Sequence, residues 1–188
     1  MIGGVPAIDK AWILKWAAAY MAGNPAHLAL ETRLLNTDGP AARSRGHYLP
    51  QEVHDIAGKW KNGNRNLPSL KQNSAADIVD ITRVAFSAPQ DLQHRILTLL
   101  SGVLVPSATA LLVFAFPDVH TVIDVRAIEA LDTLSQRGMM PNPPPLVPKG
   151  LPPYAPYRAY CVDLAKANGV SLRDLDRALW KWNEQGMQ

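Results

Sequence analysis

Cysteine is nearly absent from this 188-residue chain, which carries Cys161 alone. One thiol excludes an intrachain disulfide and any cluster held by several cysteines, and it favours a reducing compartment. The N-terminal stretch MIGGVPAIDK also lacks the basic start and apolar core of a signal peptide. We therefore expect a cytoplasmic protein with a buried thiol and without an iron–sulfur cluster.

Net charge is also small, at +3, although the isoelectric point is near 9.1. The basic side of this balance suits a polyanionic partner better than an acidic one. Strand-like patterns are limited to a few residues around Val119–Ile123. The remaining periodic segments are helical, so the sequence predicts an all-α fold.

One long run lacks charge altogether, from Leu99 to Pro117. Its length approaches that of a membrane span, but Gly102 and Pro106 interrupt it near its start. About ten continuous helical residues remain, which is too few to cross a bilayer. We expect no membrane association here, and a buried helix entered through a tight turn.

Capping residues, prolines and apolar spacing predict helices elsewhere in the chain. They cover residues 10–22, 26–35, 50–61, 74–87, 89–100, 125–136, 157–168 and 172–185. Val84, Leu92 and Leu99 are expected on buried helix faces, whereas Tyr48 is expected in a solvated loop. Residues 141–156 hold eight of the sixteen prolines and are expected to be irregular.

The segment Leu92–Leu131 combines residues that carry chemistry. A turn, Ser101-Gly102-Val103-Leu104-Val105-Pro106-Ser107, precedes the apolar helix, and Ile123-Asp124-Val125-Arg126 precedes the next one. A glycine turn at a helix N-terminus offers unpaired backbone N–H groups and a favourable dipole to a phosphate. An ionised carboxylate can stabilise positive charge that develops on a sugar during cleavage of an N-glycosidic bond.

This segment resembles the helix-hairpin-helix and catalytic-aspartate region of the DNA glycosylase superfamily that includes endonuclease III and 8-oxoguanine glycosylase. Members read L-P-G-V-G-x-K-T-A before the apolar helix and V-D-x-H/R after it. The step of eighteen residues from Pro106 to Asp124 equals the step from lysine to aspartate in endonuclease III. The resemblance covers about 50 of the 188 residues.

The resemblance implies duplex DNA as partner, a flipped nucleotide and an all-α fold with two lobes. The hairpin lobe would span residues 50–135, and residues 1–49 with 136–188 would form the second. Asp124 would be the catalytic carboxylate. The hairpin residues that would meet DNA are Gly102, Val103, Leu104, Val105, Pro106 and Ser107. Carbonyl groups that would hold a structural Na⁺ or K⁺ belong to Thr98, Leu100 and Val103.

Two residues depart from the family pattern. Leu104 replaces the second hairpin glycine, which puts the shape of the turn and the approach of a phosphate in doubt. Pro106 replaces the lysine of bifunctional members, so no Schiff base with the sugar can form there. The resemblance therefore implies a monofunctional glycosylase that releases the base with water and has no lyase step.

A basic segment without acidic residues, Lys61–Asn73, has two interpretations. As a DNA contact it would place Lys61, Arg65 and Lys71 on phosphates. Near the opposite base or the lesion it would place Asn64, Asn66, Gln72 or Asn73. As a connector it would only be solvated. Arg126 likewise is expected either on a phosphate or in a surface ion pair.

Other functions remain open at this level. The hairpin would also suit a non-catalytic DNA-binding module, and a helical interaction domain unrelated to nucleic acid is a third reading. An aspartate before a helix is most often a simple N-cap, which is the alternative for Asp124.

Overall fold

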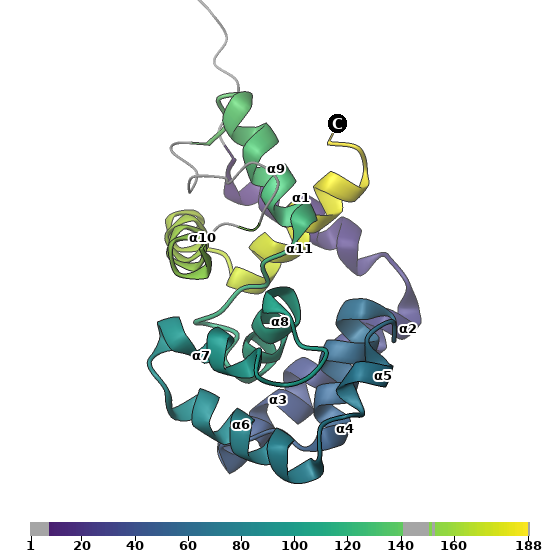
Figure 1. Cartoon of the computed structure of the whole chain (residues 1–188). Helices are drawn as coiled ribbons and strands as arrows, with labels where there is room; N and C mark the ends of the chain where they lie inside the picture. The colour runs from purple at the N-terminus through teal and green to yellow at the C-terminus, as the bar shows by residue number, and fades with distance from the viewer. Residues whose placement is uncertain (1–7, 141–150, 152, 188) are drawn as a thin grey trace, which may run out of the picture. The chain divides into compact units, whose positions relative to one another are not determined.

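A computed structural model of the chain describes residues 8–140, 151 and 153–187. Over these residues all regular secondary structure is helical and no strand forms, which confirms the all-α prediction (Figure 1). The short piece before Asp124, expected to be extended, joins no sheet. Within the same described residues, no helix has both the length and the apolar character needed to cross a membrane.

The expected helices form, two further helices form at residues 39–45 and 67–70 where loops were expected, and two π-helical segments, η1 and η2, lie among them. They are α1 (Lys10–Met21), α2 (Pro25–Arg33), η1 (Leu34–Asp38), α3 (Gly39–Arg45), α4 (Pro50–Val53), η2 (His54–Trp60), α5 (Leu67–Leu70), α6 (Ala75–Ser87), α7 (Gln90–Leu97), α8 (Val105–Ala115), α9 (Val125–Gln136), α10 (Tyr154–Asn168) and α11 (Leu172–Glu184). Most of the proline-rich segment lies outside the described residues.

The chain divides into two compact units, Asn24–Val122 and Met1–Gly23 with Ile123–Gln188. We call them the middle unit and the terminal unit. Their bounds differ from the lobes expected at 50–135 and at 1–49 with 136–188. The difference has a packing cause at the N-terminal side, because η1 and α3 pack against α8 and so belong with the middle helices.

Helix α8 is the centre of the middle unit, as the uncharged run predicts. Every residue from Ser107 to Ala115 is buried, and α8 packs against α7, η2, α3 and η1. Gly39 makes the closest of these approaches. A Cβ built on Gly39 would lie 1.9 Å from the carbonyl oxygen of Phe114, so no larger residue fits there.

The terminal unit is built on α11, which packs against α1 and α9. Trp12 and Trp182 meet edge to face, with ring centroids 5.6 Å apart. A buried ion pair joins Arg173 to Asp176, and Arg173 also donates a hydrogen bond of 3.2 Å to the hydroxyl of Tyr20. The contacts of Trp182 and Arg173 hold α11 against α1.

Sequence expectations about burial are wrong at four residues. Tyr48 is fully buried, and its hydroxyl donates to the Leu111 carbonyl at 2.7 Å. Val84, Leu92 and Leu99 are exposed rather than inside, Leu99 by 71%. Val84 and Leu92 lie on helices that are covered on a narrower stripe than their apolar residues span, whereas Leu99 follows the end of α7 and lies in the turn before α8.

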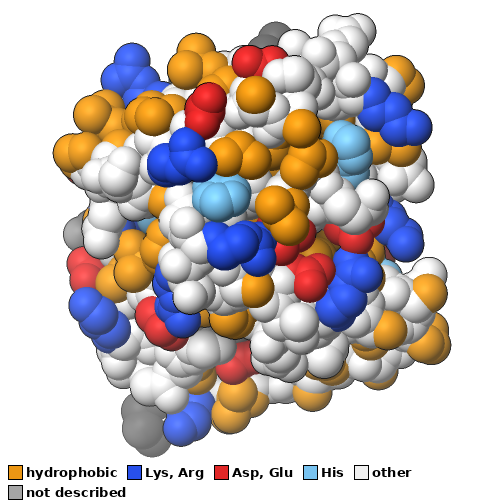
Figure 2. All heavy atoms as spheres, turned by 90° about the horizontal axis from the view of Figure 1, so that it is seen from below, with side chains coloured by type: hydrophobic (Ala, Val, Ile, Leu, Met, Phe, Trp, Pro, Cys, Tyr) orange, Lys and Arg blue, Asp and Glu red, His pale blue; other side chains and the backbone are white. Residues whose placement is uncertain are grey.

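Charged side chains of both signs are mixed on one face of the molecule. Figure 2 shows a face on which Lys and Arg lie among Asp, Glu and hydrophobic side chains. No single sign of charge covers that face.

Candidate functional site

The middle unit contains a helix–turn–helix made by α7, residues 98–104 and α8. The first part of the turn continues the helix loosely, with the N–H of Leu99 and Leu100 donating to carbonyls three residues back at 3.0 and 3.2 Å. Gly102 then reverses the chain at φ +79°. Val103 donates to the Leu100 carbonyl at 3.1 Å and closes the turn before α8 begins.

Gly102 is required at its position for two reasons. Its positive φ is unfavourable for residues with a side chain. In addition, a Cβ there would lie 2.9 Å from the Cβ of Ser69 and 3.0 Å from the Leu70 nitrogen. The turn therefore packs directly on α5, and only glycine allows this approach.

Position 104, by contrast, does not require a glycine. Its backbone is extended, with φ −93° and ψ 172°, and it is the N-cap residue of α8. A leucine adopts this conformation without strain. The replacement of the second family glycine thus leaves the backbone of the turn unstrained, and the side chain of Leu104 is 75% exposed.

Backbone donors remain open where α8 begins. Within the described part of the chain, the N–H groups of Gly102, Leu104 and Val105 have no acceptor, and Pro106 has no N–H. Leucine cannot cap the helix with its side chain. These donors and the positive end of the helix dipole together favour an anion at the turn.

Ser107 is less available than the hairpin pattern suggests. Its side chain is buried, and its hydroxyl oxygen accepts a hydrogen bond of 2.9 Å from the Asn62 side chain. Asn62 also donates to the Ala57 carbonyl at 2.7 Å. The Ser107 hydroxyl therefore joins the turn to the basic segment.

Two further asparagines of the basic segment hold the hairpin. Asn66 donates to the Gly102 carbonyl at 2.8 Å. Asn73 accepts from the Ser101 N–H at 2.8 Å and donates to the Ser101 carbonyl at 3.0 Å. These amide groups, expected near a base, are thus engaged in positioning the turn.

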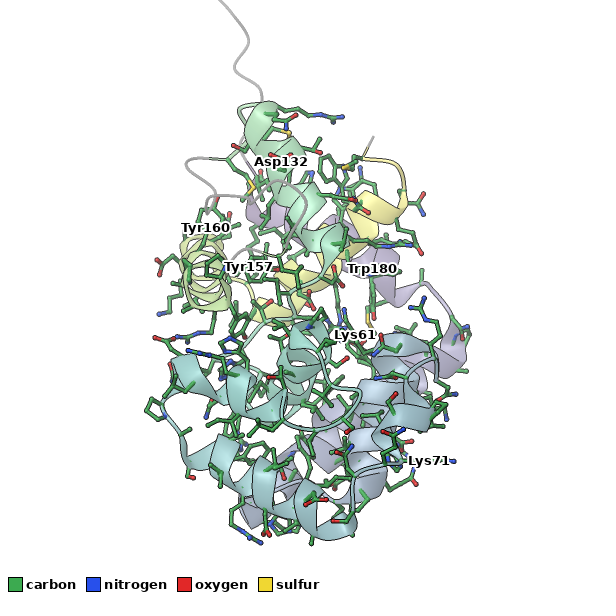
Figure 3. All side chains as sticks on the ribbon, viewed as in Figure 1. Lys61, Lys71, Asp132, Tyr157, Tyr160 and Trp180 are labelled. Carbon is green, nitrogen blue, oxygen red and sulfur yellow. The ribbon has the colours of Figure 1, made fainter. Side chains whose placement is uncertain are left out.

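The same segment carries cations beside these asparagines. It is not a plain loop, since α5 forms within it. Arg65 is exposed and donates to the Asn62 carbonyl at 3.1 Å, and Lys61 is half-buried. Lys71 is exposed without an ion pair to any described residue, and it extends away from the ribbon in Figure 3. The fold thus brings the hairpin and the basic segment together.

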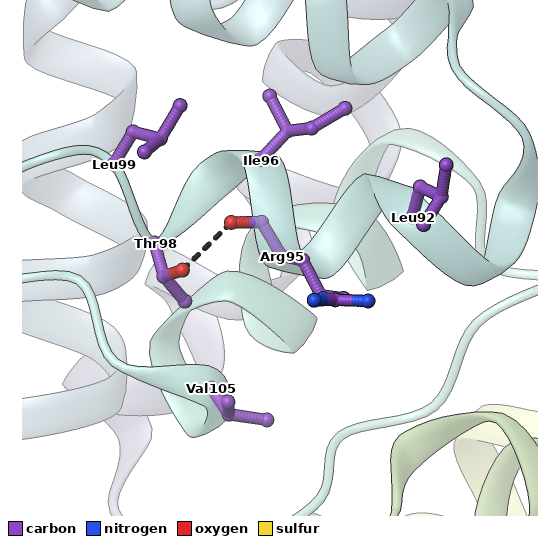
Figure 4. A pocket seen from close by; sticks show the side chains of 6 residues that line it. All are labelled: Leu92, Arg95, Ile96, Thr98, Leu99 and Val105. Carbon is purple, nitrogen blue, oxygen red and sulfur yellow. Dashed lines mark hydrogen bonds between the residues drawn. The ribbon is translucent and has the colours of Figure 1, made fainter.

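Arg95 is a candidate that the sequence pattern did not single out. It lies in the last turn of α7, where a basic residue is readily explained by the helix dipole. Its side chain is exposed and forms no ion pair in the described structure. It lines a hollow of about 500 Å³ together with Thr98, Leu99 and Val105. Figure 4 shows these side chains.

Asp124 lies in the terminal unit, at the start of α9. It is half-buried, and its Oδ1 accepts a hydrogen bond of 3.0 Å from the Ala127 N–H. The N-cap interpretation therefore holds as far as this oxygen is concerned. A catalytic role would have to coexist with capping.

On α10, the buried phenol of Tyr157 lies in the electrostatic reach of Asp124 and Asp176, and the buried thiol of Cys161 lies in that of Asp176. Burial raises the pKa of Tyr157 well above its ordinary value, and its neighbours Cys161, Asp176 and Asp124 raise it further. Burial also raises the pKa of Cys161 to about 12. The thiol is buried as expected and stays protonated at neutral pH.

Arg126 forms a surface ion pair, which is the alternative to a phosphate contact that the sequence left open. Its guanidinium lies 3.8 Å from a carboxylate oxygen of Glu184 and 4.6 Å from the ring centroid of Trp180. The side chain is still 44% exposed. A long, exposed ion pair of this kind is weak, so Arg126 can exchange it for another anion.

Metal ligation by side chains has no support in the described ranges, where no group of three or more His, Cys, Asp and Glu residues could hold an ion. The expected carbonyl ligands belong to Thr98, Leu100 and Val103, and the Leu100 carbonyl already accepts from Val103. A monovalent cation at the hairpin stays a prediction.

Comparison with known proteins adds no further constraint. No family model matches the chain, and no curated protein or solved structure matches it either. The likeness to DNA glycosylases therefore depends on the hairpin and aspartate residues alone.

Proposed function

We propose that this protein binds duplex DNA and hydrolyses the N-glycosidic bond of a damaged, mispaired or modified base. The observation that carries the proposal is the hairpin with its open N–H groups, which hydrogen bonds with three asparagines connect to the basic segment. A cytoplasmic location is part of the same proposal.

Phosphate binding is the first step. The N–H groups of Gly102, Leu104 and Val105 would donate to one phosphate, and Arg95 and Lys71 would add charge nearby. Such contacts are independent of base sequence and fix the protein on the duplex. Binding should weaken steeply as salt is added, because each neutralised phosphate releases counterions.

Bond cleavage is the second step, and Asp124 would perform it. An ionised carboxylate stabilises the positive charge that develops on the sugar and can orient the attacking water. Pro106 offers no amine, so the product would be an abasic site without strand cleavage.

A substitution series tests the catalytic role. Asp124→Asn keeps an N-cap but removes the charge, and we expect at least about a 100-fold loss of base release. Duplexes carrying a panel of modified bases would be incubated with the protein and treated with alkali to cut abasic sites. Asp9→Asn is a matched control, because Asp9 caps α1 through a 2.8 Å hydrogen bond from Trp12.

The alternative is a non-catalytic DNA-binding module, favoured by the capping bond that already occupies Asp124. Salt-dependent binding without base release over the whole panel would support this alternative. A covalent adduct trapped by borohydride would contradict the monofunctional mechanism.

A further inference from the structure

The hairpin carries the two most exposed large hydrophobic side chains among the described residues. Leu104 is 75% exposed and Leu99 is 71% exposed, on either side of Gly102 in the chain. Leu99 lines the hollow of Figure 4 with Leu92, Ile96 and Val105, and Leu104 adjoins Val105. Exposed apolar side chains therefore flank the open N–H groups of the turn along the chain.

Polar groups on this surface favour an anion. The open donors belong to Gly102, Leu104 and Val105, and Arg95 lines the same hollow as Leu99. A matching ligand has negative charge next to apolar surface. Six lining residues offer much less than the roughly 1,200 Å² that stable protein interfaces bury, which argues against a docked protein.

A DNA strand has this alternation, since each phosphate is flanked by two sugars. Deoxyribose presents a methylene group at C2′, whereas ribose presents a hydroxyl that needs a hydrogen-bond partner. Leucine side chains offer no such partner, so packing against them would leave a 2′-hydroxyl unsatisfied.

We infer that Leu99 and Leu104 pack on the sugars beside the phosphate held by the hairpin, and so select deoxyribose over ribose. This inference rests on the proposed function and specifies its substrate class. It also gives Leu104 a role in place of the family glycine, since its side chain is directed into solvent where the strand would lie.

Modified duplexes test the inference without a known target base. Three duplexes of one sequence would carry deoxyribose, 2′-fluoro or ribose sugars in one strand, and dissociation constants would be measured by fluorescence anisotropy. The 2′-fluoro and ribose strands share sugar geometry but differ in the hydroxyl. We expect the ribose duplex to bind about tenfold more weakly than the 2′-fluoro duplex, a factor equal to about 1.4 kcal/mol.

Alanine variants locate the effect. The double variant Leu99→Ala, Leu104→Ala should reduce the tenfold difference to less than about twofold, because alanine neither packs on the sugar nor caps α8. Val84→Ala removes exposed apolar surface on α6 and should leave the difference unchanged. Denaturation curves would verify that all variants are folded.

Three outcomes would overturn the inference in distinguishable ways. Equal binding of ribose and 2′-fluoro duplexes, with ordinary salt dependence, would reject sugar selection and leave DNA binding intact. Absence of salt-dependent binding to every duplex would reject the proposed function as well. Retention on phosphatidylserine vesicles that the double variant loses would assign the leucines to a lipid surface.

Discussion

Two consecutive helices, α8 and α9, begin in opposite ways. The start of α9 is closed by its own sequence, because Asp124 accepts a hydrogen bond from the Ala127 N–H. The start of α8 follows Leu104, which has no capping atom, and continues with Pro106. A capped start is complete in itself, whereas an uncapped start retains donors for a ligand.

The lack of a cap is not sufficient to define a site. α7 and α10 also begin without a side-chain cap, after Pro89 and Pro153. What distinguishes α8 is the glycine turn before it and the basic segment joined to that turn by hydrogen bonds. Local geometry and neighbouring charge together make it the stronger candidate.

The largest loss of stability is expected at Gly102, which shapes the turn before the uncapped start of α8. Gly102→Ala should destabilise the protein by about 3 kcal/mol, through backbone strain of about 1–2 kcal/mol and overpacking against α5. Urea denaturation would measure the loss. Gly63→Ala is the control, since Gly63 also has positive φ but no atom would lie within 4 Å of a Cβ added there.

This pair of variants separates the cost of backbone strain at a positive φ from the cost of overpacking against α5. Gly63→Ala should cost only about 1–2 kcal/mol because strain acts there alone. Equal losses at the two glycines would show that the approach of the turn to α5 has no energetic importance.

A second variant gives α8 the cap that α9 already has. Leu104→Asp should stabilise the helix by about 0.5–1 kcal/mol and weaken duplex binding about 100-fold, since the carboxylate would accept from the Ser107 N–H and its charge would repel the phosphate. Leu104→Asn supplies a cap without charge and should weaken binding less. Anisotropy titrations and urea midpoints would measure both effects, and unchanged affinity in Leu104→Asp would exclude the start of α8 as the phosphate site.

Local rules make the helix starts that a serine or aspartate caps predictable from sequence. The helices expected at residues 74–87 and 172–185 form with their capping serines, whose oxygens accept from Asp77 and Asp174 N–H groups. The N-cap interpretation of Asp124 has the same basis. Such interactions span three residues, so the sequence contains all of their partners.

Long-range partners are not predictable in this way. The turn is held by asparagines that lie 28 and 36 residues before it in the chain, and Tyr48 bonds to a carbonyl 63 residues away. An asparagine in a polar segment gives no signal of the backbone it will meet. Arg95 escapes sequence reasoning for a related reason, because the dipole of α7 is enough to explain it.

The hydrogen bonds of the asparagines predict an intermediate loss of stability when one of these side chains is removed. Asn73→Ala removes both hydrogen bonds to Ser101 and one of 2.8 Å to the carbonyl of the buried residue Leu70. We expect a loss of about 2 kcal/mol and faster hydrogen exchange at the Ser101 amide. Gln72→Ala, an exposed neighbour, should change neither quantity. Unaltered exchange in Asn73→Ala would mean that the turn holds its shape without this side chain.

The smallest loss of stability is expected at the start of α9, which Asp124 caps. Asp124→Ala removes the cap and should cost about 1 kcal/mol, whereas Asp124→Asn should cost only a few tenths because asparagine caps nearly as well. Urea denaturation distinguishes these values, and base release by the same variants gives the chemical half of the test. If Asp124 were only a cap, activity would follow stability and Asp124→Asn would remain active. A catalytic carboxylate instead requires a folded, capped and inactive Asp124→Asn, which is the result that would separate the two helix starts by function as well as by structure.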